Sequence, residues 1–214
     1  MNGERQEETS IRDTEKWFVL RVKWRHEDDV AAILEADGKR VFVAHTPKTE
    51  IDRRTGKEKV NKNAVAVSEI VFAYASHRFL QDRINYLRGS KNWTVYFATD
   101  SCSGDGRRLL TVPEAQMESF IRIATHTEED IQFFNPQELN LAQGDIVCVH
   151  GGPFDGCEGE FVRLKGKRGR RVVVNIMGVT AVATAEISPE FIEVVRRKQK
   201  KGKREEGVSA KTCG

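Results

Sequence analysis

Residues 151–159 read Gly-Gly-Pro-Phe-Asp-Gly-Cys-Glu-Gly, and this stretch decides how the C-terminal half of the chain folds. Apolar runs at 145–149 and 160–164 lie immediately before and after it. Glycine adopts backbone conformations that other residues avoid, and proline and aspartate favour turns. The stretch therefore predicts a tight connection between two strands, which presents its backbone to another group.

Only strand signals follow residue 143. They lie at 145–149, 160–164, 171–177, 179–187 and 192–195. Five short strands separated by turns predict a small closed β-barrel of the SH3 type.

The N-terminal half has a different pattern, in which strands alternate with amphipathic helices. Four strands are predicted: at 17–24, at 41–46, at 64–75 with apolar runs at 64–67 and 70–75, and at 94–98. The helices are predicted at 26–37, at 80–89 and from 113 onward, the last after a capping-box spacing with a proline in its first turn. This order predicts an α+β fold with a ferredoxin-like antiparallel sheet and helices.

The predicted organisation is two domains and a linker. The domains span 16–126 and 141–195, the polar linker spans 127–140, and the tails at 1–15 and 196–214 are expected to be disordered. Phe133 and Phe134 are unusual for a free linker, and we expect them to dock onto one of the domains.

Positive charge is concentrated in the C-terminal half, although the formal net charge is only +3. Seven of the nine residues at 196–204 are basic, and a solubilising tail explains them as well as a polyphosphate partner does. The basic run at 165–171 joins two strands and is therefore the better candidate for RNA binding. Its candidate residues are Lys165, Lys167, Arg168, Arg170 and Arg171.

The composition argues against several classes of protein. No apolar run is long enough to cross a membrane, the N-terminus is too polar for a secretory signal, and the four cysteines show no C-x-x-C spacing. We expect a cytoplasmic protein with free thiols. The five histidines are scattered, and Cys157 has no visible histidine partner and suits the turn geometry. We therefore expect no enzyme, no metal site and no cofactor.

The segment 141–159 resembles a KOW motif, with Gly159 at the position of its hallmark glycine. The motif residues are Gly152, Pro153, Phe154, Gly156 and Gly159. Trp17-Phe18-Val19-Leu20 is similar to the start of a NusG N-terminal domain, and the order of elements agrees over 16–195.

The chain thus resembles the NusG family of transcription elongation factors. Ile70-Val71-Phe72 and the segments 112–121 and 181–189 resemble its specialised RfaH-like members, especially the UpxY-type antiterminators of capsular-polysaccharide operons. Ser68-Glu69-Ile70 stands where a housekeeping factor usually has Pro-Gly-Tyr. This departure favours a specialised paralogue and puts the aromatic contact of that site in doubt.

The resemblance implies a first domain that docks on the clamp helices of RNA polymerase, and the candidates for this patch are Ile70, Phe72 and Tyr96. Core packing explains Phe72 equally well. Lys23, Trp24 and Arg25 lie where related proteins approach the non-template DNA, and their cation–aromatic–cation order suits phosphate attraction and base stacking. An exposed turn at the entry to a helix is an equal alternative.

The resemblance also implies that the KOW domain recruits the termination factor Rho, a ribosomal protein or nucleic acid, such as nascent RNA. Some paralogues refold this domain into helices. Here the valine- and threonine-rich strands predict a persistent barrel. The function implied is that of a monomeric transcription elongation and antitermination factor. The alternative is a ribosome- or RNA-associated KOW protein that uses the basic loop and tail.

Overall fold

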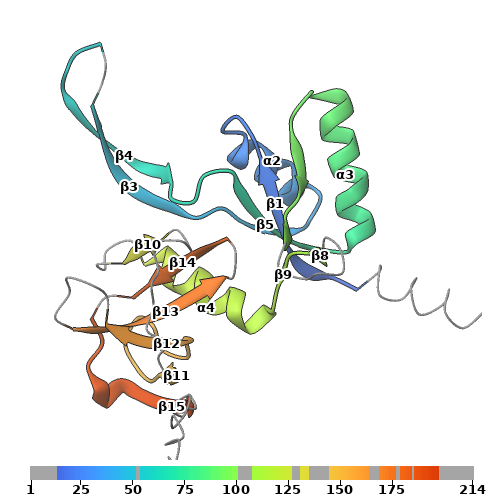
Figure 1. The fold of residues 1–214 in the computed structure, drawn as a ribbon. Helices are drawn as coiled ribbons and strands as arrows, with labels where there is room; N and C mark the ends of the chain where they lie inside the picture. Colours follow the sequence, from blue (N-terminus) through green and yellow to red (C-terminus); the bar gives the residue numbers. More distant parts are fainter. Residues whose placement is uncertain are drawn as a thin grey trace, which may run out of the picture.

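The computed structural model describes residues 14–51, 54–100, 108–126, 131–134, 145–163, 169–176, 179–184 and 186–197. Within them, three α-helices accompany antiparallel sheets, which confirms the predicted α+β class. Two larger sheets, one from each half of the chain, contribute to the core (Figure 1). Nearly all of the two predicted tails lies outside the described residues.

The first sheet is built around β1 (Lys16–Val22), which pairs antiparallel with three neighbours. The strand order is β2-β5-β1-β6, and β9 also pairs with β1. The other strands are β2 (Arg40–Phe42), β5 (Ile70–Ala75), β6 (Val95–Phe97) and β9 (Thr111–Val112). Successive side chains of a strand point to opposite faces, and β1 and β5 are buried along nearly their whole length. Both faces of the sheet are therefore covered.

The helices cover the two faces unequally. On one face lie α2 (Glu27–Ala36) and α3 (His77–Ser90), whose Val30, Leu34, Leu80 and Ile84 pack in one cluster with Leu20 of β1. On the other lies α4 (Glu114–Thr125), which belongs to a second cluster. These are the three helices that apolar periodicity predicts.

A long two-stranded hairpin of β3 (His45–Ile51) and β4 (Glu58–Val65) projects away from both sheets (Figure 1). The predicted strand at 41–46 and the predicted apolar run at 64–67 overlap only the two ends of this hairpin, and most of its length comes from the charged sequence between them. A second short pair consists of β7 (Thr99–Asp100) and β8 (Arg108–Leu109).

The second sheet differs from the predicted closed barrel of five strands. It has six strands in the order β10-β14-β13-β12-β11-β15, and among the described residues no pairing joins its two ends. The strands are β10 (Gln132–Phe134), β11 (Asp145–Val149), β12 (Glu158–Arg163), β13 (Arg170–Ile176), β14 (Thr180–Ala183) and β15 (Ile192–Arg196), the last preceded by a 3₁₀ turn at Pro189–Phe191. The extra strand β10 comes from the predicted linker and pairs with β14. It occupies the edge of β14 that would have to pair with β15 to close the sheet into a barrel.

Helix α4 joins the two halves into one hydrophobic core. Phe120 of α4 packs against Phe72 of the first sheet, with ring centroids 5.6 Å apart, and against Phe133 of β10 at 6.4 Å. Val147 and Val172 of the second sheet belong to the same cluster. Phe133 thus docks as the sequence suggests, and it does so as part of a strand.

Candidate nucleic-acid interface

One edge of the first sheet collects unusual backbone conformations. Among the described residues, the non-glycine residues with positive φ are Trp24 (68°), Arg25 (61°), Glu69 (65°) and Asn92 (56°). Trp24 and Arg25 follow the end of β1, Glu69 precedes β5, and Asn92 lies shortly before β6. Because β1 runs antiparallel to β5 and β6, all four positions lie at the same edge.

Such conformations cost about 1–3 kcal/mol each and persist only where surrounding contacts hold them. Here the contacts are backbone hydrogen bonds: Val22 N–H donates to Glu69 O at 3.0 Å, and Lys23 N–H donates to Thr94 O at 3.0 Å. Strained residues of this kind concentrate at binding sites. The edge is therefore the strongest candidate site in the described part of the molecule.

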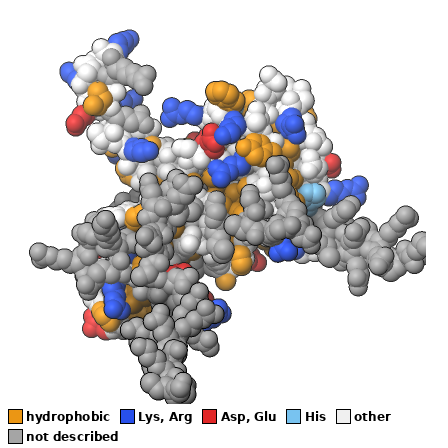
Figure 2. Space-filling model, viewed as in Figure 1, with side chains coloured by type: hydrophobic (Ala, Val, Ile, Leu, Met, Phe, Trp, Pro, Cys, Tyr) orange, Lys and Arg blue, Asp and Glu red, His pale blue; other side chains and the backbone are white. Residues whose placement is uncertain are grey.

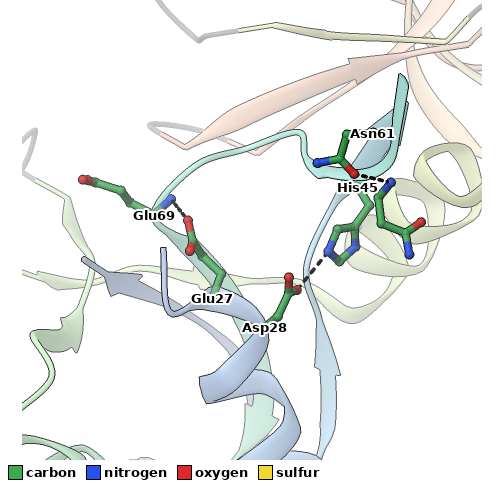
Figure 3. A network of polar contacts seen from close by, with 6 residues as sticks. Glu27, Asp28, His45, Asn61 and Glu69 are labelled. Atoms are coloured by element: carbon green, nitrogen blue, oxygen red, sulfur yellow. Dashed lines mark hydrogen bonds and ion pairs between the residues drawn. The ribbon is translucent and has the colours of Figure 1, made fainter. Parts of the chain in front are cut away.

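A buried carboxylate holds the edge from the side of α2. Glu27 is 3% exposed, and its Oε1 accepts a hydrogen bond from the backbone N–H of Glu69 at 2.7 Å (Figure 3). Its neighbour Asp28 reaches His45 at the base of the hairpin, with Oδ1 and Nε2 2.9 Å apart. The first turn of α2 thus fixes both the turn before β5 and the start of β3. Glu27, Asp28 and Asp29 all lie in this first turn, where the helix dipole also stabilises negative charge.

The three predicted nucleic-acid residues differ in what they offer. Trp24 is 81% exposed and Arg25 is also exposed, whereas the Lys23 ammonium forms an ion pair with the Glu69 carboxylate. His26 follows with its ring stacked on Trp93, the ring centroids 4.4 Å apart. Trp24 and Arg25 are therefore the accessible pair. Figure 2 shows Lys and Arg side chains around hydrophobic ones on the first half of the molecule.

The three candidate polymerase-binding residues do not form one surface. Ile70 and Phe72 are 2% and 0% exposed, and Phe72 packs under Phe42 and Phe120. In this structure they lie in the core, which is the alternative that the sequence left open for Phe72. Tyr96 is 41% exposed and lies directly opposite Arg21 in the register of β1 and β6. Among the three, only Tyr96 offers a surface to a partner.

The glycine-rich turn at 151–159 is a compact structure that contacts α4. Gly151, Gly152 and Gly156 have φ values of 85°, 70° and 75°, and Phe154 is buried. Arg122 of α4 donates a hydrogen bond to Asp155 O. The group to which this turn presents its backbone is therefore a helix of the same chain.

Gly159 is required by a close approach of strands. A Cβ atom there would lie 2.6 Å from Val173 O and 2.8 Å from Val172 Cγ1. Pro153 is exposed. The hallmark glycine of the KOW-like segment thus has a steric role in the pairing of β12 with β13.

The basic loop offers less than the sequence suggested. Lys165, Lys167 and Arg168 lie outside the described residues. Arg171 is 5% exposed and donates from Nη1 to Thr184 O at 2.8 Å, so it has a structural role and is no candidate for RNA contact. Arg170 is exposed, and its guanidinium lies 5.5 Å from the ring centroid of Phe161. The alternation of side chains along β13 explains this difference between neighbours.

The sequence did not reveal how α4 attaches to the second sheet. Gln116 Nε2 donates to Asn175 O at 2.8 Å, Ser119 Oγ accepts from Glu158 N at 3.2 Å, and Arg122 contacts the glycine-rich turn. These residues are spaced by three, so they lie along one side of the helix. That spacing of polar residues beside an apolar stripe was the available signal.

The described residues contain no group of three or more His, Cys, Asp or Glu side chains that could hold a metal ion. Burial raises the pKa of the Cys157 thiol to about 11, so this thiol is protonated at neutral pH. None of the described helices is long and apolar enough to span a membrane.

No family model matches the chain, and none of the curated proteins matches it.

Proposed function

We propose that this protein is a transcription elongation and antitermination factor of the NusG type that binds RNA polymerase and single-stranded nucleic acid. The observation that carries the proposal is the exposed Trp24 on a strained turn, with Arg25 beside it. Aromatic side chains stack on unpaired bases, and adjacent cations attract the phosphates. This proposal rests on the resemblance of the sequence and on the chemistry of this edge.

The architecture is compatible with that resemblance. The strand order β2-β5-β1-β6, with helices after β1 and β5, supports a ferredoxin-like first domain of the NusG N-terminal type. The antiparallel strands β11 to β15 support a KOW module, with β10 as an addition to it. Rho or a ribosomal protein remains the proposed partner of this module.

In the proposed mechanism, Trp24 stacks on an unpaired base of the non-template strand and Arg25 contacts its backbone. Tyr96 extends the surface toward the clamp helices of the polymerase. Docking through Ile70 and Phe72 would require α4 to leave the sheet, because Phe120 packs on Phe72. The factor does no covalent chemistry and acts by favouring the non-paused state of the polymerase.

Two variants test the nucleic-acid part. Trp24→Ala should weaken binding of a fluorescein-labelled single-stranded DNA 12-mer by about 1–3 kcal/mol, the usual worth of one stacked base, whereas Trp24→Phe should retain most of it. Tyr86→Ala is the matched control, because Tyr86 is a half-exposed aromatic residue on α3. Equal binding by Trp24→Ala and the parent protein in fluorescence anisotropy would refute the assignment of this edge.

A pull-down of core RNA polymerase tests the other part. Binding should be retained by the parent protein and weakened by Tyr96→Glu. If the full chain captures RNA at low salt but no polymerase, the ribosome- or RNA-associated KOW protein becomes the better hypothesis. In that case binding should depend on Arg170, which is the exposed candidate of the basic loop within the described residues.

A further inference from the structure

A two-stranded ribbon projects from the first half of the molecule, close to the candidate interface. The ribbon is the hairpin of β3 and β4, which pair from His45–Val65 at its base to Ile51–Glu58 near its tip (Figure 1). At about 3.3 Å per residue, the seven residues of β3 span roughly 20 Å. An isolated pair of strands is only marginally stable. Packing within the chain therefore does not explain the length of this ribbon.

The base of the ribbon is fixed to the candidate interface. Asp28 of α2 holds His45 at the start of β3, with Oδ1 and Nε2 2.9 Å apart, and the preceding residue Glu27 accepts from the backbone N–H of Glu69 at 2.7 Å (Figure 3). Glu69 in turn pairs with Lys23, the residue before the exposed aromatic turn. One turn of α2 thus sets the position of the ribbon relative to that turn.

The ribbon carries an excess of positive charge. Its described residues, 45–51 and 54–65, include five basic and two acidic side chains, so their formal charge is +3, as large as that of the whole chain. Four exposed lysines of the ribbon form no ion pair with another described residue: Lys48, Lys57, Lys59 and Lys62. Figure 2 shows Lys and Arg side chains both on the ribbon and on the adjoining part of the first half. The positive surface of the candidate interface therefore continues onto the ribbon.

Two of these lysines share one face of the ribbon. Lys48 of β3 lies opposite Asn61 of β4, and Lys59 lies two residues before Asn61, so all three are on the same face. The other face carries Ile51 and Val60, which are 68% and 58% exposed. The polar face with Lys48 and Lys59 is the one that suits a polyanion.

The chemistry of the ribbon differs from that of the exposed turn beside it. Unpaired bases are bound by stacking on aromatic side chains, and residues 45–65 contain no Phe, Trp or Tyr. Lysines attract phosphates whatever the base sequence. The major groove of B-form DNA, about 12 Å wide, admits a two-stranded ribbon, whereas the deep and narrow major groove of A-form RNA does not admit side chains. These features favour a DNA duplex as the partner of the ribbon.

We propose that the β3–β4 ribbon binds the phosphate backbone of a DNA duplex, so that the interface as a whole takes a junction between unpaired and paired DNA. Trp24 and Arg25 hold the unpaired strand, and Lys48 and Lys59 contact phosphates of the adjoining duplex. For its single-stranded part this inference rests on the proposed function. It adds the duplex and the surface that binds it.

Fluorescence anisotropy with the full-length chain tests the proposal on two fluorescein-labelled DNAs. One is a single-stranded 12-mer, and the other is a fork in which the same 12-mer continues into a duplex of about 16 base pairs. Each phosphate contact on B-form DNA changes log K by about 0.9 per tenfold change in salt, so two added contacts should tighten binding of the fork by about tenfold or more at roughly 0.1 M salt. A fork that binds no more tightly than the single strand overturns the proposal.

A pair of double variants assigns the gain to the ribbon. Lys48→Gln with Lys59→Gln should remove most of the gain and lower the salt slope of fork binding by about 2, while binding of the single strand is retained. Lys16→Gln with Arg78→Gln is the matched control, because it removes the same charge from two exposed positions at the opposite end of the first sheet. The basic tail is present in every variant, so its contribution cancels in the comparison.

The remaining outcomes separate this inference from the proposed function. An equal loss of fork binding in the two double variants would show non-specific attraction and overturn the proposal, and equal affinity for a forked RNA would overturn the assignment to DNA. If the single strand binds through Trp24 but the gain survives Lys48→Gln with Lys59→Gln, the proposed function stands and this inference fails. If Trp24→Ala has no effect while the lysine variant still weakens fork binding, the assignment of Trp24 fails and duplex binding by the ribbon stands.

Discussion

Replacing Gly159 by alanine should destabilise the second half of the molecule, because β12 and β13 approach too closely for a side chain. The added Cβ would meet the carbonyl oxygen of Val173 at 2.6 Å and Cγ1 of Val172 at 2.8 Å. Contacts below 3.0 Å essentially never occur for Cβ atoms, and one of these two involves backbone. The side chain therefore cannot simply move away, and the ladder between the strands must shift.

The expected magnitude follows from two opposing effects. Overpacking of a well-packed site usually costs about 1–3 kcal/mol, and a shift of backbone lies at the upper end of that range. Alanine also has less backbone freedom than glycine in the unfolded chain, and this stabilises the folded state by roughly 0.4–1 kcal/mol. The free energy of unfolding should thus fall by about 1–2 kcal/mol.

Urea denaturation followed by circular dichroism measures this change. Gly89→Ala is the matched control, because Gly89 lies within α3 and a Cβ there would meet nothing within 4 Å. That variant should gain roughly 0.5–1 kcal/mol from helix propensity. If Gly159→Ala unfolds at the same urea concentration as the parent protein, the steric role assigned to Gly159 is wrong.

Three further predictions concern the core and the candidate interface. Phe120→Ala should lower the free energy of unfolding by about 3–5 kcal/mol and destabilise both halves together. Tryptophan fluorescence reports unfolding of the first half, and labelling of Cys157 reports unfolding of the second. The two probes should agree on one midpoint in the parent protein and on one lower midpoint in the variant. Since burial raises the pKa of Cys157 from 9.0 to about 11, the unfolded thiol ionises first, and the free energy of unfolding should fall between these pH values; Cys157→Ala should reduce that fall. Glu27→Ala leaves the Glu69 N–H without its acceptor and should lower the free energy of unfolding by about 1–3 kcal/mol. Asp29→Ala in the same helical turn is the control and should lower it by roughly 0.3–1 kcal/mol. Glu27→Ala should also weaken binding of single-stranded DNA.

The sequence predicted the features that depend on local patterns. The three helices follow from apolar residues at helical spacing, and β1, β2, β5 and β6 of the first sheet follow from alternation and apolar runs. Strand β9 was not predicted, because Thr111 and Val112 were interpreted as the start of the following helix. Gly159 was singled out by the resemblance to a KOW motif, and its steric cause is seen only in the structure. The buried state and low reactivity of Cys157 agree with its prediction as a turn residue.

Features that depend on contacts between distant segments were not predictable. β10 forms a strand because Phe133 and Phe134 pair with the free edge of β14. The sequence did not indicate a strand here, because the residues around them are polar and typical of turns. Arg171 looks identical to Arg170 in sequence, and only the orientation of β13 buries it against Thr184. The burial of Phe72 likewise depends on α4, which follows it by some forty residues.

The candidate interface combines both kinds of information. The cation–aromatic–cation order at 23–25 was visible in the sequence, but a flexible exposed turn would explain it equally well. The left-handed conformations of Trp24 and Arg25 weaken that explanation, because a free turn would relax them. Hydrogen bonds of Val22, Lys23 and Glu27 to the neighbouring turns hold these left-handed conformations in place. These hydrogen bonds offset the conformational strain and keep Trp24 in an exposed position. A single exposed aromatic residue is common on protein surfaces, so its exposure alone does not indicate a partner. The strained backbone that holds the indole ring outward is the feature that favours the binding hypothesis.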